Sequence, residues 1–301
     1  MTGINSGAHG AALRPGQRLR ELLAREGAVL PVLGLPTARY GKIMQDAGTV
    51  AGFVGTSITY GNYTGLPDTG VASAPECVAI GGQIARAVDF PLILDGDTGH
   101  GGKAAVTRLV QDCIREGLAG LRLDDQPLES KQRTQSGDLV VCDIDVAIER
   151  YRWAVEARDD VDPSFVIMAQ CYARDAADGG LDSLLERLSA YDIDGGVDWV
   201  QFEAPHSIDE IAKARRSVRG WFSAMKGRLP RALTLDEHAE LGLDAAWYTF
   251  LPSRVLMAEC LRFMRDFEER GIQSWNEYEQ DNSELLAAER NWLAARPLPG
   301  N

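Results

Sequence analysis

Two carboxylates separated by one residue are the strongest chemical signal in the chain. Asp95 and Asp97 follow the apolar run 92–94 and lead into a glycine-rich turn that ends at Gly102. Carboxylate oxygens are the ligands that Mg²⁺ and Mn²⁺ prefer, and Mg²⁺ commonly takes one or two protein carboxylates together with water and substrate. The spacing therefore predicts a hard-cation site. The alternative is an Asx-type turn that carries surface carboxylates.

Eight short apolar runs recur along the chain, and segments with helical spacing lie between most of them. The runs cover residues 28–35, 51–54, 91–94, 118–123, 165–169, 197–202, 221–224 and 245–250, and the helical segments include 105–116, 145–158, 180–189 and 207–217. Alternating strands and helices indicate a parallel sheet, and eight such units favour an α/β fold of the (β/α)₈ TIM-barrel type. The continuous apolarity of the runs is typical of strands buried on both faces.

Polar residues fall at or just past the carboxyl ends of separate predicted strands. They are Asp95, Asp97, Asp124, Asp125, Gln170 and Glu203. Barrel enzymes assemble their active sites at this face. A single Asp in such a place is typical of a helix N-cap, which is the alternative interpretation. Several acidic strand ends on one face favour a metal centre.

The pattern divides the chain into three parts. Residues 1–15 form a Gly- and Ala-rich arm, residues 16–270 form the barrel, and residues 271–301 form a C-terminal helical tail. Helices are expected at 254–269 and 276–295. The second of these carries Leu285, Leu286, Trp292 and Leu293, which need a surface to cover them. We therefore expect extra C-terminal helices that are exchanged or packed between the subunits of a homodimer or homotetramer.

Composition excludes several classes of protein. A net charge of −13 argues against a nucleic-acid partner, because such binding depends on clustered Lys and Arg. The five cysteines are scattered and form no C-x-x-C pair, so neither a disulfide framework nor a zinc knuckle is indicated. No apolar run approaches the roughly 18 residues that a bilayer requires, and the N-terminus lacks a signal-peptide pattern. We expect no membrane partner and a cytoplasmic location.

Five segments together resemble the isocitrate lyase and phosphoenolpyruvate mutase superfamily. They are residues 65–68 (GLPD), 95–102 (DGDTGHGG), 117–126 (GLAGLRLDDQ), 165–169 (FVIMA) and 202–205 (FEAP). The resemblance extends from about Gly27 to Phe267. Members of this superfamily are Mg²⁺-dependent barrels that act on small 2-oxo or 2-hydroxy acids. The metal chelates the oxygens of the substrate and stabilises an enolate.

The resemblance also implies a role for individual residues. Asp95 and Asp97 would hold Mg²⁺ (or Mn²⁺) directly or through water. Asp124 would be a third metal residue in place of the usual Glu, and its shorter side chain would reach the metal by water or after a small shift. Asp68 matches an active-site acid. The implied substrate-binding residues are Gly55, Thr56 and Ser57, which match a loop that cradles a carboxylate, together with His100, Gln170 and Glu203.

Two departures from the family pattern affect the acid and the anion site. The lyase loop carries a Cys where this chain has Gln132 or Arg133, and neither of these shuttles a proton near neutral pH. The Arg that grips a substrate carboxylate is replaced by Gln170, which can offer hydrogen bonds but no charge. We consider Lys131 as a cation for an anionic substrate, and Tyr172 as an acid; a Tyr at a barrel rim is otherwise a packing residue.

A third departure is Ala224, where the family commonly has Asn. The metal half of the site is thus kept, and the remainder is rebuilt. We predict a Mg²⁺-dependent carbon–carbon lyase that acts on a small 2-hydroxy or 2-oxo carboxylic acid through a metal-stabilised enolate, with an atypical substrate. One alternative is a phosphonopyruvate-type P–C mutase or hydrolase, which needs no Cys. The other is a non-catalytic binding protein on the same fold.

Overall fold

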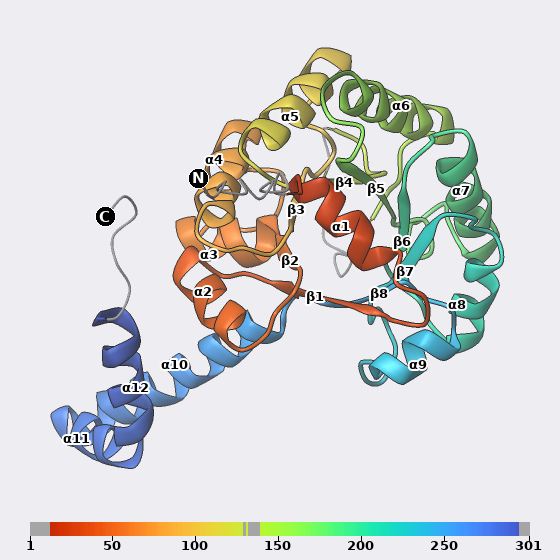
Figure 1. Cartoon of the computed structure of the whole chain (residues 1–301). Helices are drawn as coiled ribbons and strands as arrows, with labels where there is room; N and C mark the ends of the chain where they lie inside the picture. The colour runs from red at the N-terminus through yellow and green to blue at the C-terminus, as the bar shows by residue number, and fades with distance from the viewer. Residues whose placement is uncertain (1–12, 129–130, 132–138, 295–301) are drawn as a thin grey trace, which may run out of the picture. The chain divides into compact units, whose positions relative to one another are not determined.

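Eight parallel strands form a closed barrel in the computed structural model, which describes residues 13–128, 131 and 139–294 (Figure 1). The strands follow one another around the barrel in chain order, and β1 pairs with β8 to close it. Their bounds are β1 Leu30–Gly34, β2 Gly52–Val54, β3 Leu92–Asp95, β4 Gly120–Asp124, β5 Val166–Cys171, β6 Trp199–Phe202, β7 Trp221–Ala224 and β8 Ala245–Tyr248. The predicted (β/α)₈ barrel is confirmed.

Helices connect successive strands and surround the barrel (Figure 1). They are α2 Ala38–Asp46, the π-helix η1 Thr56–Tyr60, α3 Gly61–Thr64, α4 Ala74–Ala85, α5 Lys103–Arg115, α6 Ile144–Val161, α7 Leu181–Ile193, α8 Ile208–Arg215 and α9 Leu235–Glu240. An earlier helix, α1 Pro15–Leu23, packs on the amino-terminal side of β5. Its Arg20 donates hydrogen bonds to Ser164 O at 2.7 Å and to Asp198 Oδ1 at 2.7 Å.

The register of the central strands sets the polar strand ends side by side. Asp95 on β3 is paired with Arg122 on β4, Asp124 on β4 with Gln170 on β5, and Gln170 with Gln201 on β6. The carboxyl ends of parallel strands meet at one rim. The predicted polar strand ends on β3, β4 and β5 therefore lie at the same end of the barrel.

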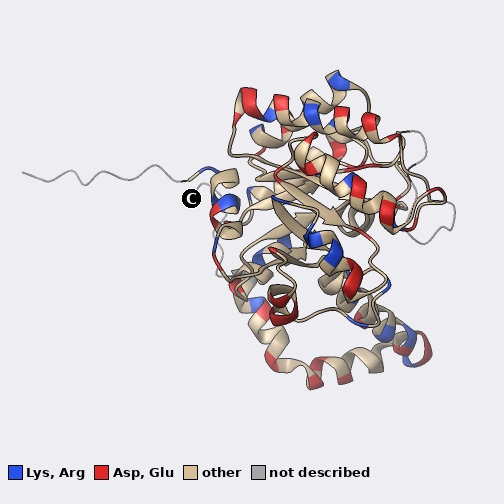
Figure 2. Ribbon diagram, turned by 90° about the vertical axis from the view of Figure 1, so that its right-hand side faces the viewer, with Lys and Arg blue, Asp and Glu red and all other residues tan. Residues whose placement is uncertain are grey.

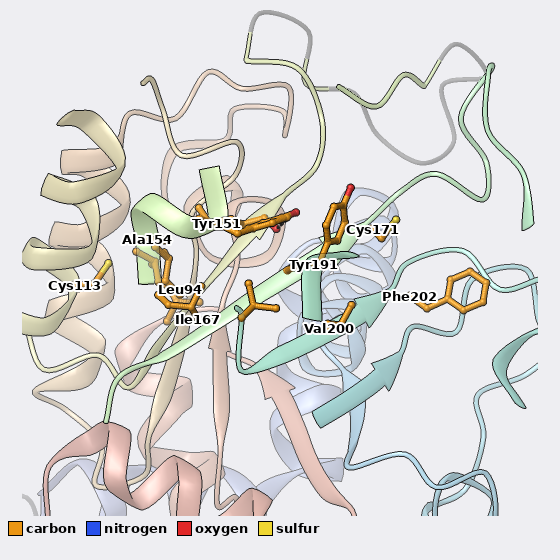
Figure 3. Close-up of a cluster of buried hydrophobic side chains, with 14 of the residues drawn as sticks. Leu94, Cys113, Tyr151, Ala154, Ile167, Cys171, Tyr191, Val200 and Phe202 are labelled. Carbon is orange, nitrogen blue, oxygen red and sulfur yellow. Dashed lines mark hydrogen bonds between the residues drawn. The ribbon is translucent and has the colours of Figure 1, made fainter. Parts of the chain in front are cut away.

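Apolar side chains fill the space both outside and inside the strands. The outer layer includes Leu94, Ile167 and Val200 against the flanking helices, and the rings of Tyr151 and Tyr191 meet edge to face at 4.8 Å (Figure 3). Inside the barrel, Phe53, Trp199 and Trp247 pack with aliphatic residues, and the Phe53 and Trp247 centroids are 5.1 Å apart. Two apolar layers thus hold the strands rigidly under the rim.

A second compact unit begins at Ser253, whereas the first ends at Pro252. It contains most of α10 Leu251–Arg270, together with α11 Ile272–Asp281 and α12 Ser283–Ala294. The single helix predicted at 276–295 is wrong, because the chain leaves the helical conformation at Asn282, where φ is −114° and ψ is 20°. The Asn282 side chain donates a 2.9 Å hydrogen bond to Tyr278 O, and such local bonds compete with a continuing helix.

Charged residues of both signs lie on the outer helices (Figure 2). Several form ion pairs along one helix, such as Arg108 with Asp112 on α5. Among the described residues, none of the helices combines the length and the apolarity that crossing a membrane requires.

Candidate active site

The turn after β3 brings the two predicted metal carboxylates together. Asp97 and His100 adopt left-handed backbone with φ of 48° and 58°, and Gly99 lies between them at φ 85°. Asp is one of the few residues with a side chain that visits this region without a large penalty. The turn is fixed to β4, because Asp124 N donates to Asp97 O at 2.7 Å. A strained backbone held by its neighbours is typical of a functional site.

Asp95, Asp97 and Asp124 form a buried cluster, which we call the acid cluster. One carboxylate oxygen from each lies within 4.8 Å of the others. Asp95 Oδ1, Asp97 Oδ2 and both oxygens of Asp124 have no hydrogen-bond partner among the described residues. Burial, followed by the Asp95 charge, raises the pKa of Asp124 well above its usual range. Buried unpaired carboxylate oxygens are costly, and a hard divalent cation would satisfy them. The acid cluster therefore fits a Mg²⁺ or Mn²⁺ ion.

The second oxygen of Asp95 is held from below by a buried arginine. Arg122 Nη2 donates to Asp95 Oδ2 at 2.9 Å, and its guanidinium carbon lies 4.4 Å from the centroid of the Phe53 ring. Burial alone would raise the pKa of Asp95, but Arg122 and then Lys131 lower it overall. Arg122 Nη1 also donates to Gln201 Oε1 at 3.3 Å. One oxygen of Asp95 is thus fixed, and the other is left for a cation.

Arg122 is not among the site residues predicted from the sequence. A signal was present, because a charge between Leu121 and Leu123 interrupts an otherwise apolar strand. Only the register of β3 and β4 reveals its partner.

Lys131 lies inside the acid cluster. Its Nζ contacts Asp97 Oδ1 and lies 3.2 Å from Asp68 Oδ1 and 3.8 Å from Asp124 Oδ2. The side chain is only 6% exposed. The hydroxyl of Thr56 is 3.0 Å from Asp68 Oδ1 and 3.1 Å from Asp95 Oδ2. Predicted catalytic residues Lys131 and Asp68 therefore meet the predicted metal ligands.

Gln170 and Glu203 join the site from β5 and from the residue after β6. Gln170 Nε2 donates to Glu203 Oε2, and Gln170 Oε1 has no hydrogen-bond partner among the described residues. Tyr172 follows β5 and is 7% exposed. Burial, then Asp124 and Glu203, raise the pKa of Tyr172 well above its usual range, so its phenol keeps the proton at neutral pH. This part of the rim carries an amide where the resemblance of the sequence implies an Arg.

The remaining predicted residues lie around the same rim. Gly55 N donates to Thr59 Oγ1 at 3.2 Å, and Thr56 begins the π-helix η1. A small pocket lined by Val54, Gly55, Thr56, Tyr60, Cys77, Ile80, Leu94 and Asp95 adjoins this loop. Burial lowers the pKa of His100, which keeps its imidazole neutral. Ser57 is half-buried in η1, while Gln132 and Arg133 lie outside the described residues.

A further ring of residues holds the strand ends without entering the acid cluster. Asp125 Oδ1 accepts a bond from Tyr172 N at 2.9 Å, and Asp125 Oδ2 accepts one from Tyr191 at 2.8 Å. Arg150 on α6 donates to Gln126 O at 3.0 Å and to Asp124 O. Asp125, a polar strand end noted in the sequence, thus positions β5 instead of joining the carboxylates of the acid cluster.

Residues 35–267 match the family described as phosphoenolpyruvate phosphomutase. The matched range includes every member of the acid cluster. The chain belongs to this family. The superfamily resemblance predicted from the sequence is confirmed.

The proteins to which this chain is similar include several lyases. The chain is 30% identical to the probable 2-methylisocitrate lyase 2 of Corynebacterium glutamicum over 287 residues, which cover 93% of this chain and 91% of the relative. It is 28% identical to the 2-methylisocitrate lyase of Shewanella oneidensis over 261 residues, covering 86% and 87%. Both relatives are named as 2-methylisocitrate lyases, and the chain belongs to the same superfamily of enzymes.

Solved structures share the fold of this family member. A complex of oxaloacetate acetylhydrolase with 3,3-difluorooxalacetate aligns with a TM-score of 0.80 at 22% identity, covering 92% of this chain and 97% of the other. The 2,3-dimethylmalate lyase, described as a PEP mutase/isocitrate lyase superfamily member, aligns with a TM-score of 0.78 at 20% identity, covering 91% and 96%.

Proposed function

We propose that this family member is a Mg²⁺-dependent lyase that cleaves or forms a carbon–carbon bond in a small 2-hydroxy or 2-oxo carboxylic acid. The observation that carries the proposal is the acid cluster, whose buried oxygens lack partners at the rim where barrel enzymes place their chemistry. The relatives named as 2-methylisocitrate lyases support the same class of reaction.

Asp95, Asp97 and Asp124 would hold the metal. When bound, Mg²⁺ supplies Lewis-acid stabilisation of the negative charge that develops on an enolate oxygen. Arg122 and Thr56 hold Asp95 by one oxygen, which leaves Asp95 Oδ1 without a hydrogen-bond partner among the described residues and available to a cation. The Asp95 carboxylate is thus positioned before any ligand binds, which limits the rearrangement of side chains that binding requires.

Lys131 and Tyr172 are the proposed proton-bearing groups of the reaction, with Asp68 beside Lys131. The ammonium of Lys131 has three N–H donors next to the acid cluster, so it can bind an anionic substrate or donate a proton to the enolate carbon. The raised pKa of Tyr172 restricts its phenol to donating a hydrogen bond near neutral pH. These roles replace that of the family Cys.

The proposed substrate-binding residues are Gly55, Thr56, Ser57, His100, Gln170 and Glu203. At the Gln170 position a neutral amide bonded to Glu203 faces the rim, and it offers no charge for a bidentate grip on a carboxylate. We therefore expect the substrate to place a neutral polar group there. The small pocket lined by Val54, Ile80 and Leu94, among others, would accept only a small apolar substituent.

An NMR turnover screen tests the proposal. The panel comprises isocitrate, 2-methylisocitrate, 2,3-dimethylmalate, oxaloacetate and phosphonopyruvate, each with and without Mg²⁺. We expect Mg²⁺-dependent conversion of at least one acid, and loss of that conversion in Asp97→Asn. Conversion of phosphonopyruvate alone would favour the P–C mutase or hydrolase alternative, to which the matched family description also points. If no acid in the panel is converted or bound, the result would favour a non-catalytic binding protein and contradict the lyase.

We also propose that the chain forms a homodimer or homotetramer through its second unit. Large apolar side chains on α10 to α12 are exposed in the single chain, including Val255 at 67%, Ile272 at 65% and Leu285 at 71%. Exposed apolar surface of this kind marks an interaction site. Light scattering after size exclusion should give a multimer, and Leu261→Glu with Met264→Glu should reduce its mass. A monomeric parent protein would contradict this assembly.

A further inference from the structure

The ammonium of Lys131 is enclosed by carboxylates that come from three separate segments. Asp68, Asp97 and Asp124 each have an oxygen within 4 Å of it. Lys131 Nζ also donates to Thr56 Oγ1 at 3.3 Å, and a Cβ placed on Gly70 would lie 3.5 Å from Lys131 Cβ. The side chain therefore packs against the segment that carries Asp68. A lysine ammonium is a compact charge with three donors, so it suits several carboxylates at once.

We propose that Lys131 is the resident counter-ion of the acid cluster and that its charge sets the affinity of the site for Mg²⁺. The inference rests on the metal centre proposed above. Buried carboxylates that lie together repel one another unless a cation offsets their charge. Lys131 supplies that cation from within the chain, so the cluster is partly neutralised before a metal binds.

Lys131 and the metal would share Asp97, but they would use different oxygens of it. Lys131 engages Asp97 Oδ1, whereas Asp97 Oδ2 and Asp95 Oδ1 have no hydrogen-bond partner among the described residues. A metal at the unpartnered oxygens would therefore lie a short distance from the ammonium. Like charges this close, in a buried site, repel strongly. Metal binding must work against Lys131 whether the ammonium stays or is displaced.

This arrangement couples the metal to an anionic substrate. A substrate carboxylate that attracts the ammonium removes part of the charge that opposes Mg²⁺. Because coupling between two ligands is reciprocal, Mg²⁺ then tightens substrate binding by the same factor. Lys131 would thus make tight metal binding conditional on the presence of substrate.

Calorimetric titration of Mg²⁺ into the substrate-free protein tests the proposal. The variants are Lys131→Met, which removes the charge at similar length, Lys131→Arg, which keeps it, and Asp97→Asn. Lys103→Met is the matched control, because Lys103 forms a 2.7 Å ion pair with Glu156 on the exposed surface. We expect Lys131→Met to lower the Kd for Mg²⁺ by roughly tenfold or more. Lys131→Arg and Lys103→Met should remain close to the parent protein.

Thermal unfolding in EDTA gives a second readout. Without the ammonium the acid cluster is uncompensated, so Lys131→Met should melt at a lower temperature than Lys103→Met and gain more on adding Mg²⁺. If Lys131→Met folds only with Mg²⁺, the counter-ion role is supported, and Lys131→Gln should repeat the result. An unchanged or raised Kd in Lys131→Met would overturn the proposal, as would an unchanged melting temperature in EDTA. Absence of Mg²⁺ binding in every variant and in the parent would instead overturn the metal centre and the proposed function together.

Discussion

Replacement of Arg122 by Met should destabilise the metal-free protein more than any comparable change on the surface. The side chains of Arg122 and Asp95 are 7% and 6% exposed, and their ion pair measures 2.9 Å. Removing one partner of a buried pair typically costs about 3–5 kcal/mol, because the other charge stays buried without compensation. Lys131 also lowers the pKa of Asp95, so part of its charge remains offset. We therefore expect a loss of about 3 kcal/mol in the free energy of unfolding, at the lower end of this range.

A double-mutant cycle with Asp95→Asn separates the pair from the packing around it. Asp95→Asn removes one negative charge from the acid cluster and leaves Arg122 over Phe53 and bonded to Gln201. It also leaves the buried Arg122 charge without its ion-pair partner, so it should be destabilising without metal, but less so than Arg122→Met because repulsion within the acid cluster falls at the same time. Adding Arg122→Met to Asp95→Asn should cost less than adding it to the parent, because position 95 then carries no buried charge that loses its partner.

The assay is urea unfolding in EDTA at neutral pH. Arg215→Met is the control, since this arginine also lies over an aromatic ring, Phe222 at 5.7 Å, and beside a carboxylate, Asp244 at 3.7 Å. Its side chain is 24% exposed, and an ion pair at the protein surface is commonly worth about 0–1 kcal/mol. A loss below about 1 kcal/mol in Arg122→Met, or strict additivity in the cycle, would refute the reasoning.

Three further predictions concern the turn, the packing and the pH response. Asp97→Asn and Asp97→Ala should both lose Mg²⁺ affinity in calorimetry. In urea unfolding, Asp97→Ala should be about 1 kcal/mol less stable than Asp97→Asn, because Asn tolerates left-handed backbone. Equal stabilities of the two variants would contradict this. Gly96→Ala should cost about 1–3 kcal/mol, since its Cβ would lie 2.7 Å from Leu121 Cδ1; a neutral effect would show that the turn can shift. Burial lowers the pKa of His238. As pH falls through about 6.5, the unfolded chain therefore binds a proton at this residue while the folded chain does not, and the protein loses stability. His238→Gln should lose less stability between pH 7 and 5, and an identical pH slope would count against this cause.

The arrangement of strands could be read from the sequence because it depends on local patterns. Apolar runs with helical segments between them predict eight strands, and parallel pairing then sends Asp95, Asp124 and Gln170 to one rim. The ion pair between Arg122 and Asp95 could not be predicted, because it depends on the register of two strands and not on spacing along the chain.

Lys131 shows a second limit of the sequence. Its residue type indicates a cation, but only the folded chain places its ammonium against Asp68, Asp97 and Asp124. The break at Asn282 was missed for a related reason, since the surrounding residues have helical spacing on both sides and a single side-chain bond to Tyr278 accompanies the interruption.

Closure of the barrel by β1 and β8 has a consequence for synthesis on the ribosome. Leu30 pairs with Ala245, and Arg20 of α1 donates hydrogen bonds to Ser164 and Asp198. These partners of α1 and β1 are therefore synthesised much later than α1 and β1 themselves. Contacts of such long sequence separation form slowly. Until β8 emerges, β1 and β7 each keep one unpaired edge, which can join another chain. The yield of soluble protein should therefore depend on translation rate and on chaperones that shield a nascent strand.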